Sequence, residues 1–284
     1  MKRNTLARLA ILTVLVSGAG WVPAASAAPK AAKAKPKAAL DAAALRAELE
    51  SGDEARMLAA LERVAEAGEA AKALTPDVEA LLRRGASAKV IRAALTAAGA
   101  LRQESSSAAV APYLRHRDEG LRRGAARALV KTGGTAAVKA LRAALRSPDA
   151  GVRGVAASGL GALGAREALP DLFTALDRRV DEAATSIGQL CEPEECEKFA
   201  ARLGKLPFEV MTSGFDQILF RAPEKMSDDA KLRIVDRLRE LGTAEAGKFL
   251  ADVAGRWPAS WSKRVKQAID AAVKATGGGA EADD

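Results

Sequence analysis

Residues 147–164 of the chain read SPDAGVRGVAASGLGALG, and versions of this stretch recur on both sides at a nearly fixed spacing. Four of its apolar residues match residues 31 positions earlier: Val152 with Leu121, Ala156 with Ala125, Ala157 with Ala126, and Leu160 with Leu129. In a third copy, Asp181, Ala184 and Leu190 follow Asp149, Ala156 and Leu160 at a similar spacing. Self-similarity at this period is typical of helical hairpins that stack on copies of themselves. The sequence therefore predicts an all-α fold, an α-solenoid (superhelix) of stacked antiparallel helical hairpins.

Composition agrees with helices rather than strands. Aromatic residues make up only 4% of the 284 residues, and Tyr113 is the sole tyrosine. A β-sandwich or barrel would lack the aromatic and β-branched side chains that strands prefer. From Leu40 onward apolar residues recur at helical spacing, and the sequence Ser51-Gly52-Asp53-Glu54 predicts a helix start capped by Ser51.

The first 27 residues have the layout of a secretory signal peptide. Basic residues at 2, 3 and 8 precede an apolar run, Leu9 to Val16, and the small-residue site Ala25-Ser26-Ala27. We expect cleavage between Ala27 and Ala28. The alternative, an uncleaved anchor, would need about 20 apolar residues to span a bilayer, more than this run supplies. The pattern predicts a periplasmic or secreted protein that is soluble after cleavage, with no transmembrane segment in the mature chain.

The net charge of +8 suggests nucleic acid as a partner, but its distribution argues against that class. Three positive charges fall in the signal and four in residues 28–39, which leaves 37 basic against 36 acidic side chains for residues 40–284. We therefore expect no nucleic-acid partner. Residues 28–39, APKAAKAKPKAA, have no large apolar side chain and are interpreted as an extended linker. As an alternative to a plain spacer, its lysines can make weak contacts with anionic polymers or lipids.

The repeated motif also resembles a known family. The run Asp149-Ala150-Gly151-Val152-Arg153, the alanine pair at 156–157 and the Leu-Gly steps at 160–161 and 163–164 resemble the short HEAT-like repeats named after phycobilisome lyases. Pro170 also falls where that family often has proline in its first helix. The resemblance implies a right-handed solenoid whose second helices line the inner surface and which serves as a binding scaffold. It does not imply lyase chemistry, because the motif describes packing.

On this basis the chain divides into six parts. The expected boundaries are 1–27 for the signal peptide, 28–39 for the Ala/Pro/Lys-rich linker, 40–105 for divergent N-terminal helical hairpins, 106–196 for the HEAT-like repeats, 197–276 for an aromatic-richer C-terminal helical cap, and 277–284 for a disordered tail.

Charged pairs recur in the repeats. Asp118 and Arg122, like Asp149 and Arg153, are four residues apart, so each carboxylate can face an arginine one helical turn on. In the family an Asp/Arg ladder ties neighbouring repeats together through the turn. The alternative is a basic strip on the inner face, in which the candidate partner-binding residues are Arg122, Arg123, Arg127 and Arg153.

Cys191 and Cys196 are the only cysteines, and the exported context predicts a disulfide between them. A redox site would have the tighter C-x-x-C spacing, and zinc would need two further ligands beyond the single histidine. His116, that histidine, falls in the turn position that Ser147 occupies one period later, and is interpreted as a turn residue. We expect no metal site, no cofactor and no catalytic residue.

Seven of the ten aromatic residues fall between residues 197 and 276, where the repeat pattern breaks down. Their simplest role is a larger core beneath a terminal cap. The alternative is a recognition surface, because large aromatic and arginine side chains are enriched in interaction hot spots. Its candidate partner-binding residues are Phe215, Phe220, Arg221, Trp257 and Trp261.

These features favour an exported, non-catalytic repeat scaffold that binds a protein or peptide partner in the cell envelope. Two alternatives stay open. One is an enzyme or enzyme accessory with a lyase-like or carboxylate-based site near Cys191–Arg221. The other is an envelope-polymer binder that acts through the lysine-rich linker.

Overall fold

The computed structural model describes residues 41–277. The predicted signal peptide, its cleavage site at Ala27 and Ala28, the linker 28–39 and residues 278–284 of the tail lie outside the described residues. Within residues 41–277 the backbone forms helices and turns. The α-helices are α1 (Ala42–Glu50), α2 (Glu54–Ala67), α3 (Thr75–Arg84), α4 (Ala88–Leu101), α5 (Ser107–Val110), α6 (Glu119–Thr132), α7 (Gly134–Ala144), α8 (Ala150–Ala162), α9 (Leu169–Asp177), α10 (Glu182–Leu190), α11 (Pro193–Ala200), α12 (Phe208–Leu219), α13 (Asp228–Leu241), α14 (Ala244–Arg256) and α15 (Lys263–Ala275). The 3-10 helices are η1 (Gly68–Leu74), η2 (Glu104–Ser106), η3 (Ala111–Arg115) and η4 (Arg166–Ala168).

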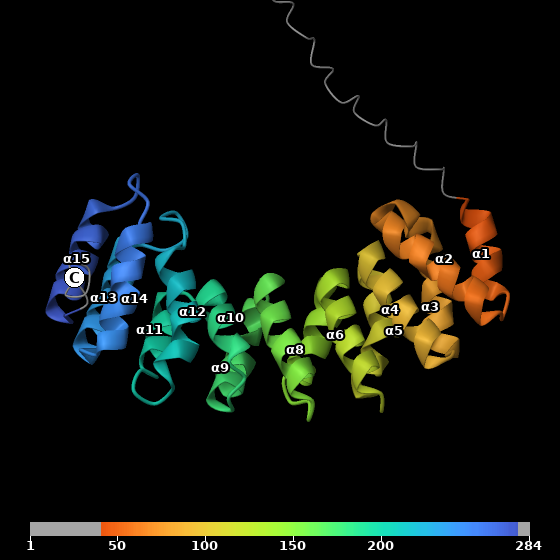
Figure 1. Cartoon of the computed structure of the whole chain (residues 1–284), viewed down its shortest axis with the longest axis horizontal. Helices are drawn as coiled ribbons and strands as arrows, with labels where there is room; N and C mark the ends of the chain where they lie inside the picture. Colours follow the sequence, from red (N-terminus) through yellow and green to blue (C-terminus); the bar gives the residue numbers. More distant parts are fainter. Residues whose placement is uncertain (1–40, 278–284) are drawn as a thin grey trace, which may run out of the picture. The chain divides into compact units, whose positions relative to one another are not determined.

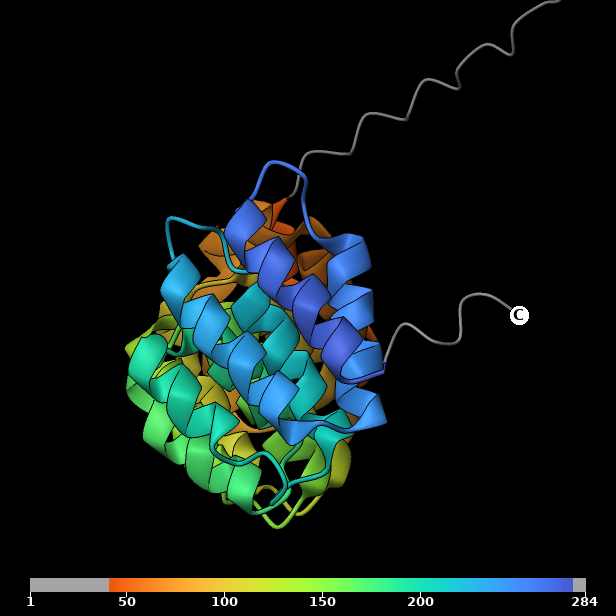
Figure 2. The same cartoon turned by 90° about the vertical axis from the view of Figure 1, so that its left-hand side faces the viewer.

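Successive helices alternate between two layers (Figure 1). In one layer α2, α4, α6, α8, α10 and α12 each pack on the next member of that series. In the other, α1 packs on α3, α3 on α5, and α5 on α7. The predicted solenoid of stacked helical hairpins is therefore confirmed. The last helix, α15, packs on both α13 and α14 and closes this end of the stack, which Figure 2 shows toward the viewer.

Three second-layer helices start in the same way, each one repeat period after the last. Ser87, Asp118 and Asp149 cap α4, α6 and α8, and each side chain accepts a hydrogen bond from the amide three residues on. Such caps satisfy an amide that has no partner inside the helix. The hairpin of α3 and α4 is thus one more copy of the repeat, with serine in place of aspartate.

The capping residue predicted before α2 is wrong by two positions. Asp53, and not Ser51, precedes the first helical residue, and its carboxylate accepts from the amide of Arg56 at 2.9 Å. The Ser51 hydroxyl instead donates to the carbonyl of Glu48 at the end of α1. Both residues are good caps, and the carboxylate also favours the positive end of the helix.

Glycines set two features that matter for the site. Gly133 and Gly134, with φ of 68° and 76°, join α6 to α7 through a backbone conformation that other residues rarely adopt. Gly188 and Gly214 let α10 and α12 approach closely, because a Cβ on Gly188 would lie 2.3 Å from the carbonyl oxygen of Gly214. The first pair fixes where α7 begins, and the second brings the chain after α12 beside the end of α10.

Among the described residues, every helix is too short or too polar to cross a lipid bilayer.

Candidate functional site

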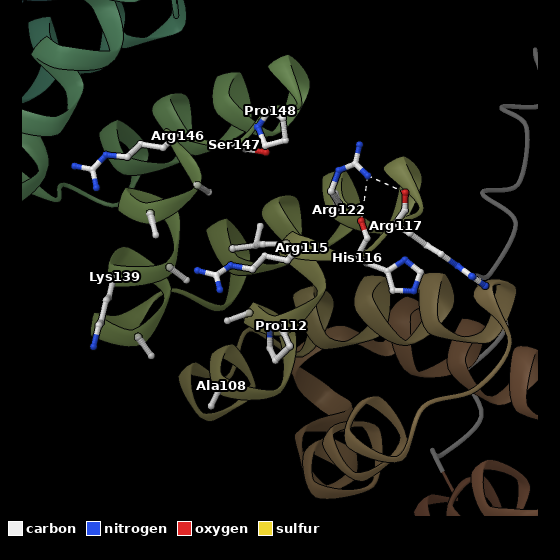
Figure 3. Close-up of a pocket in the computed structure, with 16 residues that line it drawn as sticks. Ala108, Pro112, Arg115, His116, Arg117, Arg122, Lys139, Arg146, Ser147 and Pro148 are labelled. Carbon is white, nitrogen blue, oxygen red and sulfur yellow. Dashed lines mark hydrogen bonds between the residues drawn. The ribbon is translucent and has the colours of Figure 1, made fainter.

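A groove lies between the first helices of two neighbouring hairpins, α5 with η3 on one side and α7 on the other (Figure 3). Its volume is about 1080 Å³. The floor is made largely of small apolar side chains: Ala108, Ala111, Pro112, Ala136, Ala140 and Ala143. We call this hollow the α5–α7 groove.

Pro112 explains why a groove opens here. Proline has no amide hydrogen to donate and its ring clashes with the carbonyl four residues earlier, so an α-helix rarely continues through it. In accord with this, α5 ends at Val110 and the chain continues as the 3-10 helix η3. Tyr113 then anchors η3 on the previous hairpin, since its hydroxyl donates to the carbonyl of Leu82 at 2.6 Å, and burial raises the pKa of that hydroxyl.

The rim of the groove is basic. Arg115, Arg117, Arg122, Lys139 and Arg146 line it together with His116, and none of its described lining residues is acidic. Figure 3 shows Arg115 extending from the end of η3 toward α7, while Lys139 on α7 and Arg146 in the turn after α7 lie apart from each other. Arg117 points the other way. With Arg117 directed away, Arg115, Arg122, Lys139 and Arg146 remain around an apolar floor.

One rim residue, Arg122, holds the turn in front of α6. Its Nη1 donates to the carbonyls of His116 and Arg117, at 3.0 Å and 2.9 Å. One period later Arg153 donates to the carbonyls of Ser147 and Pro148, at 2.8 Å and 3.1 Å. Both arginines thus close the turn of their own hairpin, which leaves them little freedom to bind a partner.

Aspartate–arginine pairs join neighbouring hairpins. Asp149 accepts from Arg122 Nη2 at 2.9 Å and from Arg123 Nε at 3.2 Å, and only 2% of its side chain is exposed. The pairs predicted four residues apart are not the ones formed: Asp118 lies 3.8 Å from Arg92 of the preceding hairpin. Burial alone would raise the pKa of Asp149, but the hydrogen bonds from Val152, Arg122 and Arg123 outweigh it, and the pKa is lowered.

Three of the four arginines predicted to form a basic strip make the contacts just described. Arg122 and Arg123 pair with Asp149 of the next hairpin, as a ladder between repeats expects, whereas Arg153 binds carbonyls of its own turn and no aspartate among the described residues. Arg127 is exposed on α6 and has no ion pair with a described residue. His116 is a turn residue, as predicted, because its Nδ1 accepts from the amide of Asp118 at 3.0 Å. Ser147 Oγ accepts from the amide of Asp149 in the same way.

Cys191 and Cys196 form a disulfide, as predicted. It joins Cys191, the residue that follows α10, to Cys196 inside α11. Arg221 Nη1 donates to the carbonyl of Cys191 at 2.6 Å, and Nη2 donates to that of Gly188. These carbonyls end α10, so Arg221 acts as a cap from the next hairpin. Burial lowers the pKa of its guanidinium, and Arg221 is held in this structural role.

The aromatic candidates divide into two groups. Phe215 is wholly buried against Phe199, so its prediction as a partner contact is wrong, and it belongs to the core. Phe220, Trp257 and Trp261 form a separate cluster with ring centroids 5.4 to 6.3 Å apart. Trp257 is nearly buried, with its ring nitrogen donating to the carbonyl of Ser262, whereas Phe220 and Trp261 are half-buried.

The aromatic cluster surrounds a buried lysine that sequence reasoning missed. Lys231 is 1% exposed, its ammonium lies 4.4 Å from the ring centre of Trp261, and it donates to the carbonyl of Arg221. Burial lowers the pKa of Lys231, against the opposing attraction of Asp228. Because the lysine is satisfied within the chain, the cluster is a core built around a cation.

The α5–α7 groove was also missed by sequence reasoning, although a signal for it exists. Pro112 is the second residue of the 3-10 helix η3, just after α5 ends at Val110, whereas Pro170 falls in the first turn of the α-helix α9, where proline is tolerated. The alanines at 136, 140 and 143 also share one face of α7 by their spacing. The region considered for an enzyme site, residues 191–221, lines neither the groove nor the smaller hollow beside it. Residues 41–277 contain no cluster of His, Cys, Asp or Glu that could hold a metal ion.

Comparison with protein-family models gives two matches. A model of HEAT repeats matches residues 75–160, and a model of the PBS lyase HEAT-like repeat matches residues 152–178. The predicted repeat family is therefore confirmed for residues 75–178. The match begins at Thr75, one repeat period before the expected start of the regular repeats at 106, and so includes the hairpin of α3 and α4.

Solved structures resemble the chain only distantly. The complex of CpcE and CpcF of phycocyanin lyase from Nostoc sp. PCC7120 is 20% identical, with 87% of this chain and 99% of that chain covered and a TM-score of 0.46. A designed armadillo repeat protein in complex with the peptide (KR)4 is 15% identical, with coverage of 84% and 100% and a TM-score of 0.41. No curated protein matches the sequence.

Proposed function

We propose that this HEAT-like repeat protein is an exported, non-catalytic scaffold that binds a segment of a partner protein in the cell envelope, and that the α5–α7 groove is its binding site. The single observation that carries the proposal is the groove itself. Its volume of about 1080 Å³ is as large as the largest typical ligand pockets, and its floor is apolar, as in most binding sites.

The groove is held ready for a partner. Tyr113 fixes η3 to α3, and Arg122 fixes the turn at one end of the groove, so its walls are set by hydrogen bonds within the chain. A site that is already ordered loses less conformational entropy when a ligand binds. Rigid display by stacked hairpins is therefore the mechanism that we propose.

The exported location in this proposal is supported by residues 1–27, with their order of basic, apolar and small residues. The disulfide between Cys191 and Cys196 agrees with an oxidising compartment. N-terminal sequencing of the protein from native cells tests the location. We expect a chain that starts at Ala28, and an intact Met1 on cytoplasmic protein would contradict export.

Site-specific photo-crosslinking tests the binding site. A crosslinking amino acid in place of Ala140, on the groove floor, should give a discrete protein adduct in native cells. The matched control is the same amino acid in place of Ala271, an exposed alanine of α15. Adduct formation should disappear when Ala143→Trp fills the groove. Equal adducts from positions 140 and 271, or adducts that survive the filling, would contradict the assignment of the groove.

The polymer-binding alternative predicts a different result. If the lysine-rich linker were the main attachment, a chain lacking residues 28–39 would lose envelope association in a salt-dependent manner, and Ala143→Trp would have no effect. Our proposal expects the opposite: the chain lacking residues 28–39 keeps its binding, and Ala143→Trp abolishes it.

A further inference from the structure

We infer that the partner segment bound in the α5–α7 groove is an acidic peptide, with aliphatic side chains on the alanine floor and carboxylates paired with Arg115, Lys139 and Arg146. This inference rests on the proposed function, because it names the chemistry of the occupant of the same groove.

The charge of the groove is a local property. Residues 40–284 carry 37 basic and 36 acidic side chains, so this part of the chain as a whole is almost neutral. The groove departs from that balance, since all the charged side chains among its described lining residues are basic. Across an interface, charge complementarity favours partners of opposite sign and speeds their encounter. The preferred occupant is therefore negatively charged.

The rim cations are available to such an occupant. Arg115 and Lys139 are exposed and form no ion pair with a described residue. Arg146 shares the carboxylate of Asp171 with Arg142, and its side chain is 68% exposed. By contrast, Arg122 and Arg123 are committed to Asp149. Arg115, Lys139 and Arg146 are thus the cations that can change partner without breaking the fold.

The spacing of these cations favours a peptide over an anionic lipid. Lys139 lies within α7, whereas Arg146, seven residues further along the chain, lies in the turn after α7 ends at Ala144. Figure 3 shows these two side chains apart from each other, with Arg115 facing α7 from η3. A lipid has one head group, which calls for cations that converge on one point. A peptide can present several carboxylates at intervals and fits the observed arrangement.

The floor specifies the rest of the occupant. The alanine and proline side chains of the floor are small and leave the groove unfilled, so larger apolar groups must come from the partner. Burying such groups is favourable by about 25 cal/mol for each Å² of apolar surface removed from water. Leucine, isoleucine or valine between the acidic residues would meet both the floor and the rim.

Selection from a phage-displayed library of random linear peptides tests the inference. The wild-type mature protein is the target, and the variant with Ala136→Trp and Ala143→Trp is the counter-target. We expect the peptides that distinguish the two to be rich in Asp or Glu together with aliphatic residues. Circular dichroism checks that the variant is folded, and Ala271→Trp, on α15, is the matched control.

Charge reversal then tests the rim with one selected peptide, synthesised with a fluorescent label. Arg115→Glu together with Lys139→Glu should weaken binding roughly tenfold at low salt, and the loss should shrink as salt is added. Lys263→Glu, at an exposed position on α15, is the control and should change binding less than twofold.

The outcomes separate the two claims. Peptides that need the groove but are neutral or basic, or that bind the charge-reversed variant equally well, would overturn the acidic-peptide inference and leave the proposed function in place. Failure to find any groove-dependent peptide would count against the proposed function itself. Groove-dependent binding of vesicles of anionic phospholipid, without groove-dependent peptides, would assign the site to a lipid and overturn the inference.

Discussion

Asp149 connects three parts of the chain through one carboxylate. It caps α8 through the amide of Val152 and accepts hydrogen bonds from Arg122 and Arg123 of the preceding hairpin. Breaking a buried ion pair costs more than breaking an exposed one, because it leaves a charge without a partner. Asp149 is therefore the residue at which a single substitution should most disturb the contact between two hairpins.

We predict that Asp149→Asn lowers the free energy of unfolding by about 2 kcal/mol at neutral pH. Asparagine still caps a helix, so the loss measures the charge. Because the folded-state pKa of Asp149 is lowered, its stabilising effect is fully present above the unfolded value of about 3.9 and is lost as the pH falls through the folded value. Urea unfolding followed by circular dichroism, from pH 7 down to pH 3, measures both effects.

The matched control is Asp171→Asn, since Asp171 also binds two arginines but is 19% exposed. Its loss should be below about 1 kcal/mol. A difference between wild type and Asp149→Asn that stayed constant down to pH 3 would contradict the role given to the Asp149 charge.

Lys231 gives the opposite pH dependence. Burial lowers its folded-state pKa, so at alkaline pH the unfolded chain binds more protons than the folded one, and stability rises with pH. We predict that wild type gains stability relative to Lys231→Met between pH 7 and about pH 10, the range below the usual lysine pKa. Thermal unfolding of both proteins across this range provides the measurement. A difference independent of pH would show that Lys231 is not desolvated in the folded protein.

At the scale of the element, the contact between α10 and α12 depends on the absence of side chains. We predict that Gly188→Ala destabilises the protein by about 2 to 3 kcal/mol, because the added Cβ would lie 2.3 Å from the carbonyl oxygen of Gly214. The change in free energy of unfolding is measured in urea.

Gly255→Ala is the matched control, since Gly255 lies in α14 and the added Cβ would have no described atom within 4 Å beyond its chain neighbours and the local helix backbone. Alanine favours a helix over glycine, so this change should stabilise the protein by about 0.5 to 1 kcal/mol. Equal effects of the two substitutions would mean that α10 and α12 can move apart at little cost.

The order and type of the helices could be predicted from the sequence because each repeat carries its own start and stop signals. Asp118 and Asp149 are equivalent capping residues of successive repeats, and both cap their helices in the structure. Their ionic partners could not be predicted from spacing along one helix. In a stack, the nearest arginine in space belongs to the neighbouring hairpin, as with Asp149 and Arg122, 27 residues apart.

The candidate site was harder to predict than the fold. The residues predicted from the sequence are large or charged, such as Phe215 and Arg153. In the structure Phe215 packs in the core and Arg153 closes a turn. The α5–α7 groove depends instead on alanines and on one proline that ends a helix early. Alanines are common throughout the sequence, so those that leave a groove unfilled cannot be told from those that are packed against a neighbour.

At the scale of the whole molecule, each hairpin contacts mainly its neighbours, so stability is expected to be a sum of local terms. In a protein lacking residues 1–27, Trp257 and Trp261 are the only tryptophans, and both report on the C-terminal hairpins. We predict that Asp149→Asn shifts the urea midpoint by circular dichroism more than the midpoint by tryptophan fluorescence. In wild type the two midpoints should lie closer together. Equal shifts would mean that the stack unfolds as one cooperative unit.

The turn bonds that recur from one repeat to the next, made by Arg122 and again by Arg153, have an evolutionary consequence. A gene duplication that copies one whole period carries its own turn, cap and connection with it, so a chain can be lengthened without redesign. A copy then becomes distinct through a point mutation. Ala143 of α7 occupies the position that corresponds to Pro112, so Ala143→Pro in a duplicated copy would end that copy's helix early, as α5 ends before Pro112.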